Sequence, residues 1–368
     1  MSFCSKSFTK ALTALVLTLA SLGLAGQTGG LRGLIVDQAD QSPLNLAKVS
    51  LSAGGKTLES YTNNDGFYQV NGVQVGTYKV TFSRAGYAPQ TIEIRVSADK
   101  NTFTRITMKE SVIELDDVVI DARKQEKQTK VSTAVVQLNP KSIGTFSIGG
   151  EPDLVRALQV MPGVITTGDQ GGQLYIRGGA PIQNLVKLDG MILYNPFHSI
   201  GFFSVFETDI LQSADVYTAG FGAEYGGRTS SVMDIRTRTG RRDRISGKVS
   251  ASTYLGKALL EVPIGRKKNG IAPSSLLVSF KESLLDQAAP IFYPYVATEY
   301  DGLPFEFRDL FSKYTLETNG GNKLNIFGFN FSDAVRFAGG KSIAWNSVGY
   351  GTDFTVVPAS STRFCRAT

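Results

Sequence analysis

The sequence predicts a mainly β protein in three parts: an N-terminal β-sandwich, a small α+β domain, and the first strands of a transmembrane β-barrel. Three observations predict this fold class. The 368 residues include 39 glycines and 22 phenylalanines, a balance typical of turns and aromatic-rich strands rather than of long helices. Short alternating segments fill residues 30–110, and longer ones follow Gly240. Between them, one short helical pattern lies among glycines and short strand patterns.

Residues 1–25 have the pattern of a cleaved secretory signal peptide. Two lysines precede an apolar run at 11–22, and small residues follow it. The alternative, a membrane-spanning helix, needs about 20 apolar residues. Cys4 lies ahead of the run, where it cannot be a lipoprotein cleavage site. Once this segment is removed Cys365 stands alone, so no intramolecular disulfide is expected.

The first folded part shows the period-two alternation of antiparallel strands. The candidate strands are residues 31–37, 47–51, 57–61, 67–70, 76–84, 90–96 and 102–109. Asn63-Asn64-Asp65-Gly66 supplies turn residues that tolerate positive φ. Seven short strands in this length predict a small β-sandwich.

The second part combines one helix with a small sheet. Pro152 is expected at the first helical position, Leu154, Val155 and Leu158 share one face, and Met161-Pro162-Gly163 ends the helix. The candidate strands are residues 173–177, 185–188, 191–194, 210–217 and 231–236. Asp189-Gly190 has the chemistry of a tight hairpin turn.

The third part alternates over longer segments, which fits tilted transmembrane strands of 9–11 residues. These segments are residues 245–262, 274–285, 306–317, 323–331 and 348–356, with a turn at 318–322. Phe327, Phe329 and Phe331 share one face, which we expect to be a lipid-facing band or an aromatic girdle. A second soluble sandwich is the alternative, since its strands would also alternate.

The motifs of the second part resemble, in order and spacing, the plug domain of TonB-dependent outer-membrane receptors. The plug motif residues are Pro162, Gly163, Arg177, Gly178, Gly179, Asp189, Gly190, Glu224, Tyr225, Gly226, Gly227 and Arg228. The first part, with Asp65-Gly66-Phe67-Tyr68 and Gly76-Thr77-Tyr78, resembles the carboxypeptidase regulatory-like domain found ahead of Bacteroidetes receptors of this family. The expected domains are therefore residues 1–25 signal peptide, 30–110 sandwich, 111–140 linker, 141–240 plug and 241–368 barrel start.

The linker contains a candidate Ton box, the segment that pairs with the energising periplasmic protein in that family. It consists of Leu115, Asp116, Asp117, Val118, Val119 and Ile120. A β-branched run after acidic residues can add as a strand to another protein's sheet edge. The alternative is that the run ends the sandwich or pairs within the plug.

The resemblance implies an outer-membrane receptor that binds an extracellular ligand and imports it with inner-membrane energy. Its implied partners are a TonB-like energising protein, outer-membrane lipid, an unknown extracellular ligand and a surface lipoprotein. Such receptors have about 22 strands, whereas the residues after Gly240 supply roughly five or six, so we expect a truncated barrel. The alternative is a non-transporting exported binding or signalling protein. Neither the ligand nor its binding residues can be identified from the sequence.

Catalysis, metal binding and a cofactor are not expected. His198 is the only histidine and has no carboxylate nearby in sequence to orient it, so we expect a loop or apical plug residue. The net charge of +6 is scattered, and an exported protein does not meet nucleic acid. Arg177, Lys187, Asp189 and the Glu224–Arg228 segment supply charges for a polar plug surface against a polar barrel wall. The importer interpretation requires that residues 152–240 do not merge into one continuous soluble core with both neighbours.

Overall fold

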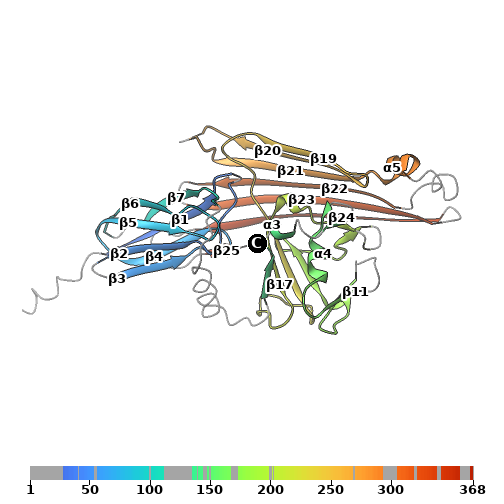
Figure 1. The fold of residues 1–368 in the computed structure, drawn as a ribbon, viewed down its shortest axis with the longest axis horizontal. Helices are drawn as coiled ribbons and strands as arrows, with labels where there is room; N and C mark the ends of the chain where they lie inside the picture. The colour runs from blue at the N-terminus through green and yellow to red at the C-terminus, as the bar shows by residue number, and fades with distance from the viewer. Residues whose placement is uncertain are drawn as a thin grey trace, which may run out of the picture.

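The computed structural model describes most of the chain in three connected parts (Figure 1). The described residues are 28–39, 41–53, 56–98, 101–111, 135–138, 140–143, 147–148, 151–166, 173–198, 201, 203–267, 270–292, 305–318, 321–337, 341–356 and 365–367. A sandwich lies at one end, and a sheet of long strands, here called the wall sheet, extends away from it. A central domain, residues 135–237, packs beneath the wall sheet.

The sandwich has all seven predicted strands. They are β1 (Thr28–Asp37), β2 (Lys48–Ala53), β3 (Lys56–Tyr61), β4 (Phe67–Gln74), β5 (Gly76–Ser83), β6 (Gln90–Val96) and β7 (Asn101–Met108). Two sheets, with strand orders β4-β1-β7 and β3-β2-β5-β6, enclose a core that includes Tyr68 packed edge-on against Phe82. The prediction of antiparallel strands is wrong for one pair, because β7 pairs parallel with β1. The chain changes sheets between β6 and β7 and so returns alongside β1 in the same direction.

The central domain contains short elements around a five-stranded sheet. They are β8 (Val135–Leu138), α3 (Pro140–Ile143), β9 (Ser147–Ile148), β10 (Glu151–Pro152), α4 (Leu154–Gln159), β11 (Val164–Thr166), β12 (Leu174–Ile176), η1 (Pro181–Gln183), β13 (Leu185–Leu188), β14 (Met191–Ile192), β15 (Phe197–His198), β16 (Phe203–Ser204), η3 (Thr208–Ile210), β17 (Leu211–Tyr217) and β18 (Val232–Thr237). The five strands follow the order β14-β13-β18-β17-β8. The predicted hairpin at Asp189-Gly190 is confirmed as the β13–β14 turn.

Helix α4 begins at Leu154, two positions later than predicted. Pro152 lies in the β10 bridge, and Asp153 caps the helix by accepting hydrogen bonds from the backbone N–H groups of Val155 and Arg156 at 2.8 and 3.1 Å. A carboxylate at the cap satisfies two free amides, which a proline at the first helical position does not do. The predicted apolar face is confirmed, since Leu154, Val155 and Leu158 are all buried.

The wall sheet has seven strands and one helix beside it. They are β19 (Ser246–Ala251), β20 (Leu255–Ile264), β21 (Ser274–Ser283), α5 (Leu285–Phe292), β22 (Phe305–Glu317), β23 (Lys323–Phe337), β24 (Lys341–Val356) and β25 (Cys365–Ala367). Neighbouring strands pair antiparallel in chain order. Within the described residues, β19 and β25 form the two edges and do not pair with each other, so no closed barrel is present.

The single segment predicted at residues 245–262 is wrong, because it is a hairpin of two strands. The hydroxyl of Ser252 accepts hydrogen bonds from the N–H groups of Tyr254 and Leu255 and closes the turn. Serine in this position competes with the sheet ladder for backbone partners, which ends the strand. In contrast, β23 and β24 continue well beyond their predicted segments.

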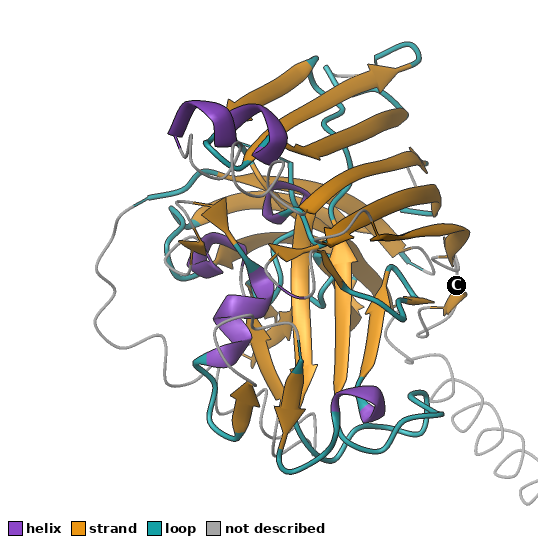
Figure 2. Ribbon diagram, turned by 90° about the vertical axis from the view of Figure 1, so that its right-hand side faces the viewer, coloured by secondary structure: helices purple, strands orange, loops and turns teal. Residues whose placement is uncertain are grey.

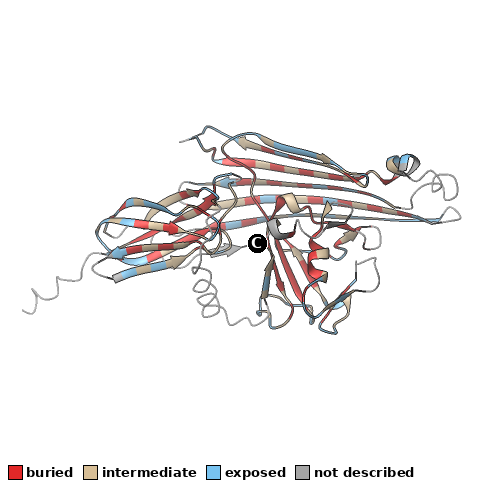
Figure 3. Ribbon diagram, in the orientation of Figure 1, coloured by how far each residue is buried: buried red, intermediate tan, exposed pale blue. Residues whose placement is uncertain are grey.

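The wall strands alternate between a buried and an exposed face along their length (Figure 3). The exposed face carries large apolar side chains: Leu260, Leu310, Leu316, Ile326, Val348 and Phe354. The buried face lies against the central domain, whose strands run across those of the wall sheet (Figure 2). The predicted alternation is therefore confirmed, with its apolar surface outward.

Candidate functional site: the central domain against the wall sheet

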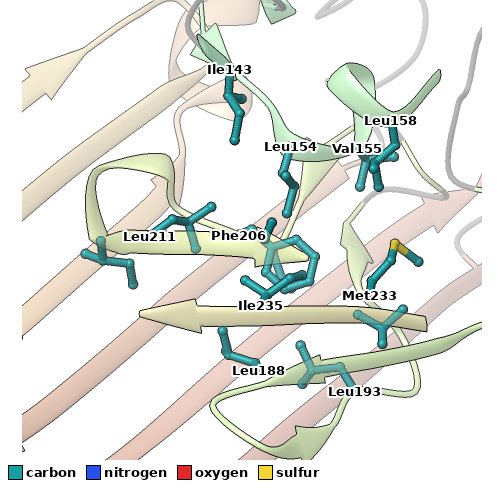
Figure 4. Close-up of a cluster of buried hydrophobic side chains, with 14 of the residues drawn as sticks. Ile143, Leu154, Val155, Leu158, Leu188, Leu193, Phe206, Leu211, Met233 and Ile235 are labelled. Atoms are coloured by element: carbon teal, nitrogen blue, oxygen red, sulfur yellow. The ribbon is translucent and has the colours of Figure 1, made fainter. Parts of the chain in front are cut away.

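The core of the central domain continues into the wall sheet. The buried apolar side chains labelled in Figure 4 come from helices α3 and α4, from strands β13, β17 and β18, and from the segments at Leu193 and Phe206. The same cluster includes Phe311 and Phe327 of the wall sheet. The sandwich core is a separate cluster, so the central domain merges with one neighbour and not with both.

The three aligned phenylalanines face the central domain and not lipid. Phe327, Phe329 and Phe331 are 3%, 7% and 5% exposed, which corrects the predicted lipid-facing band. Gly349 and Gly351 of β24 make room for them, because a Cβ on either glycine would lie 2.5 or 2.8 Å from a phenylalanine ring atom. The contact is therefore partly apolar, whereas a wholly polar one was expected.

Asp189 joins the central domain to the wall through Lys313 of β22. The Lys313 Nζ lies 3.2 and 3.3 Å from the two carboxylate oxygens and also donates to the carbonyl of Thr237 at 3.0 Å. The Thr237 N–H donates to Asp189 at 3.0 Å, and its hydroxyl contacts the same carboxylate. Asp189 has a positive φ of 48°, a backbone conformation that glycine, asparagine and aspartate tolerate best. This predicted motif residue thus forms a buried ion pair with the wall.

Glu261 of β20 holds the segment that leads from the central domain into the wall sheet. Its two carboxylate oxygens accept hydrogen bonds from the Arg238 guanidinium at 2.7 and 2.9 Å, and the N–H of Arg241 donates to it at 2.8 Å. The side chains of Arg238 and Glu261 are 9% and 5% exposed. Two parallel bonds to one carboxylate fix both partners in orientation.

Lys257 and His198 make further charged contacts between the central domain and the wall sheet. Lys257 Nζ lies 2.6 Å from Glu151 and 3.4 Å from Glu207. His198 is 1% exposed, and its ring nitrogens contact the carboxylates of Asp309 and Asp333 on the wall. The expectation that no carboxylate orients His198 is therefore wrong, because partners 111 and 135 residues away in sequence are brought to it.

Sequence reasoning missed the charged wall residues, yet a signal was present. Lys257, Glu261, Lys281, Asp309 and Lys313 all occupy odd-numbered positions of alternating strands. A charge on the face opposite the apolar one faces inward when the strand crosses a membrane.

The remaining motif residues form two groups. Around Gly163, the N–H of Arg177 donates to the Gly163 carbonyl at 2.8 Å, and a Cβ on Gly179 would lie 2.2 Å from Ser230 Oγ. In the segment from Glu224 to Arg228, the Tyr225 hydroxyl donates to Asp234 at 2.9 Å. Burial and the adjacent Asp234 carboxylate both raise the pKa of Tyr225. The structure does not join the two groups into one cluster.

The sandwich contacts the central domain through its turn at Asn64. The Asn64 side-chain amide donates to Asp215 at 3.0 Å, and Gln137 donates to the Asn64 side-chain oxygen at 3.3 Å. Two ion pairs lie nearby, since Glu317 at the end of β22 contacts Arg105 of the sandwich at 2.8 Å and Arg242 at 2.6 Å. The sandwich therefore touches both other parts.

A cavity of about 650 Å³ separates the sandwich from the central domain beside these contacts. Arg84 and Tyr87 line it from the sandwich, and Gln137, Gln212 and Ser213 line it from the central domain. The Arg84 guanidinium lies 5.3 Å from the Tyr87 ring centre and donates to Asn45 at 2.9 Å. Asn45 in turn donates to Gln137 of the central domain at 3.1 Å.

Several predictions lie outside the described residues. These include the signal peptide at 1–25 and the candidate Ton box at 115–120. Within the described ranges, no helix is both long and apolar enough to cross a membrane. No metal-holding group of three or more His, Cys, Asp and Glu side chains occurs in that part of the chain either.

The fold and the contacts define the class of protein. A small α+β domain is attached to one face of the wall sheet, and the opposite face of that sheet exposes large apolar side chains. Residues 31–120 match the family model of the CarboxypepD_reg-like domain, and residues 127–232 match that of the TonB-dependent Receptor Plug Domain. The chain thus carries a carboxypeptidase regulatory-like domain followed by a TonB-dependent receptor plug, and both resemblances found in the sequence are confirmed. We call the central domain the plug from here on.

Similar solved structures include two receptors. The siderophore receptor PirA from Acinetobacter baumannii is 15% identical, with 62% of this chain and 38% of that chain covered and a TM-score of 0.46. PirA from Pseudomonas aeruginosa is 16% identical, with 61% of this chain and 38% of that chain covered and a TM-score of 0.42. The TIE protein of Bacillus anthracis is 17% identical over 23% of this chain and 17% of its own, with a TM-score of 0.21. This chain spans less than two fifths of each of these proteins. No curated protein matches it.

Proposed function

We propose that this chain is the N-terminal part of a TonB-dependent outer-membrane receptor that binds an extracellular ligand and imports it with inner-membrane energy. The observation that carries the proposal is a plug fastened by buried ion pairs to a sheet with an apolar outer face. A soluble protein rarely leaves such a face uncovered, whereas the hydrocarbon of a membrane covers it. The two unpaired sheet edges are those to which further barrel strands would add.

The parts have separate roles in this proposal. The proposed domains are 1–25 signal peptide, 30–110 sandwich, 111–140 linker, 141–240 plug and 241–368 barrel start. Asp189 anchors the plug to the wall, and Gly163 and Gly178 supply backbone bends. The Ton box at 115–120 pairs with a TonB-like protein in the periplasm, and lipid surrounds the wall sheet. Ligand identity and a surface lipoprotein partner follow from neither the sequence nor the contacts.

Deletion of residues 115–120 from the complete receptor tests the import step. We expect loss of energised uptake and retention of ligand binding, because the deletion removes the segment that is pulled and leaves the plug and wall unchanged. The ligand is first found by growing a knockout strain on limiting ferric chelate, cobalamin, glycan or peptide. A deletion of equal length at 124–129 in the same linker is the matched control. If energised uptake persists after the 115–120 deletion, this segment is only linker and not a Ton box.

A second function, a non-transporting exported binding or signalling protein, makes a different prediction for the gene. Continued coding for alternating strands beyond codon 368, ending in an aromatic residue, supports import. A stop codon at that position in the native gene, with the chain stable in the outer membrane, supports the binding protein.

A further inference from the structure

The only histidine of the chain lies at the centre of a buried charge cluster between plug and wall. His198 Nδ1 is 2.9 Å from Asp333 on β23, and His198 Nε2 is 2.8 Å from Asp309 on β22. The imidazole stacks on Phe307, with ring centres 4.2 Å apart. Lys281 on β21 lies 3.1 Å from Asp309 and donates to the Ser204 carbonyl at 2.9 Å. Three wall strands thus converge on one plug side chain.

The hydrogen-bond geometry assigns a charge state to the ring. An ionised carboxylate only accepts hydrogen bonds, so a ring nitrogen facing each carboxylate must carry a proton. A neutral imidazole has one N–H and would set a lone pair against one of the two carboxylates. The doubly protonated ring satisfies both contacts, and with Lys281 it balances the charges of Asp309 and Asp333. Removing that proton sets a ring lone pair against one of these two buried carboxylates, which is unfavourable.

Other charged groups near the cluster already have partners. Lys257 pairs with Glu151 and Glu207, and Asp153 caps helix α4 and accepts the Ser204 N–H at 2.8 Å. Burial alone would lower the pKa of His198, and the ammonium of Lys281 acts in the same direction. Asp309 and Asp333 outweigh both, so the pKa of His198 lies above its ordinary value of 6.5.

We propose that His198 is a proton-operated latch that fastens the plug segment around β15 and β16 to strands β21, β22 and β23 of the wall sheet. The latch is closed while both ring nitrogens carry protons. Loss of one proton sets a lone pair against a buried carboxylate and opens the contact. Each cycle breaks and re-forms one ring N–H bond, whose electron pair stays on nitrogen while the proton passes to and from solvent, and no other covalent bond changes.

The pH dependence has a defined sign. A group whose pKa is raised on folding contributes stability that is complete below its unfolded value and is lost as pH rises through its folded value. The ring is therefore doubly protonated, and the latch closed, at and below about pH 6.5. The latch opens as pH rises through the higher pKa of His198 in the folded protein. The inference stands on the local geometry and does not require that the receptor imports anything.

Histidine-selective nitrogen-15 labelling tests the charge state directly, because the chain has one histidine and yields one pair of ring signals. The protein is purified with an affinity tag that lacks histidine and is titrated in detergent micelles. We expect a titration midpoint above 6.5, with both ring nitrogens mainly protonated at pH 6.5. Asp309→Asn and Asp333→Asn should each lower the midpoint. A midpoint at or below 6.5 in the unmodified protein overturns the proposal.

Hydrogen exchange shows whether protonation of His198 controls the plug–wall contact or whether the side chain only packs there. Protection factors of the peptide spanning residues 203–206 should fall at least tenfold as pH rises through the measured midpoint. In His198→Gln, which keeps one donor and does not titrate, that step should vanish. Arg308→Gln is the matched control, because Arg308 forms an exposed pair with Glu282 on the opposite face of the wall sheet. Unchanged protection across the midpoint in the unmodified protein shows that the proton does not control the contact.

Discussion

The plug meets its two neighbours in different ways. Against the wall sheet it shares one apolar core, and buried ion pairs such as Asp189–Lys313 and Arg238–Glu261 cross the boundary. Against the sandwich the cores are separate, and the contact consists of polar groups around Asn64 beside a cavity. Separating plug from wall would expose apolar area and unpaired charges, whereas separating the sandwich would expose groups that water can satisfy. We infer that plug and wall unfold together and that the sandwich unfolds on its own.

Of the variants described below, Lys313→Met should lower the free energy of unfolding most. It leaves the Asp189 carboxylate buried without its cation, and breaking a buried pair in this way costs about 3–5 kcal/mol. The free energy of unfolding is measured with urea in micelles, using the fluorescence of Trp345, the only tryptophan. Adding Asp189→Asn should recover part of the loss, since asparagine also tolerates the positive φ. A loss no larger than that of the exposed-pair variant Arg308→Gln would show that buried charge does not hold the plug.

Gly349→Ala tests the apolar half of the same boundary. The added Cβ would lie 2.5 Å from the Phe329 ring, which is itself stacked on Phe331 at 4.5 Å and has little freedom to move. Overpacking of this kind costs about 1–3 kcal/mol. Gly226→Ala is the control, because a Cβ added at Gly226 would meet no other atom within 4 Å. Equal stability of the two variants in the urea assay would mean that this part of the wall packs loosely.

Asn64→Ala should have the smallest effect and should be confined to the sandwich contact. It removes the hydrogen bonds to Asp215 and Gln137, with a net cost of about 1 kcal/mol, or about fivefold in the opening equilibrium. Hydrogen exchange of the turn at residues 62–67 should quicken by that factor, while β2 and β5 stay protected. Asn71→Ala, whose partner is the exposed Gln69, is the control. Loss of protection throughout the sandwich would contradict a separate core.

Much of the fold could be predicted because local pattern determines it. Seven sandwich strands follow from alternation and turn residues, and the hairpin at Asp189 follows from Asp-Gly chemistry. Period two also places Phe327, Phe329 and Phe331 on one face. It does not reveal which face is buried, since that depends on what packs there. The two glycines of the neighbouring strand, Gly349 and Gly351, were the available signal, because they leave space for rings on that side.

The charged contacts were less predictable because their partners are distant in sequence. His198 finds Asp309 and Asp333 only after β22 and β23 have paired in register. The parallel pairing of β1 with β7 likewise depends on which of the two sheets the chain enters after β6. Alternation within a strand does not indicate which sheet that strand joins. Short motifs therefore predicted the elements, while the tertiary arrangement determined the ion pairs.

The double attachment at Glu261 limits how the plug can move. Arg238 and the N–H of Arg241 both bind this one carboxylate just where the chain leaves the plug for the wall. With that corner held at two points, the chain between Arg238 and Arg241 cannot shift along β20 without breaking both sets of hydrogen bonds.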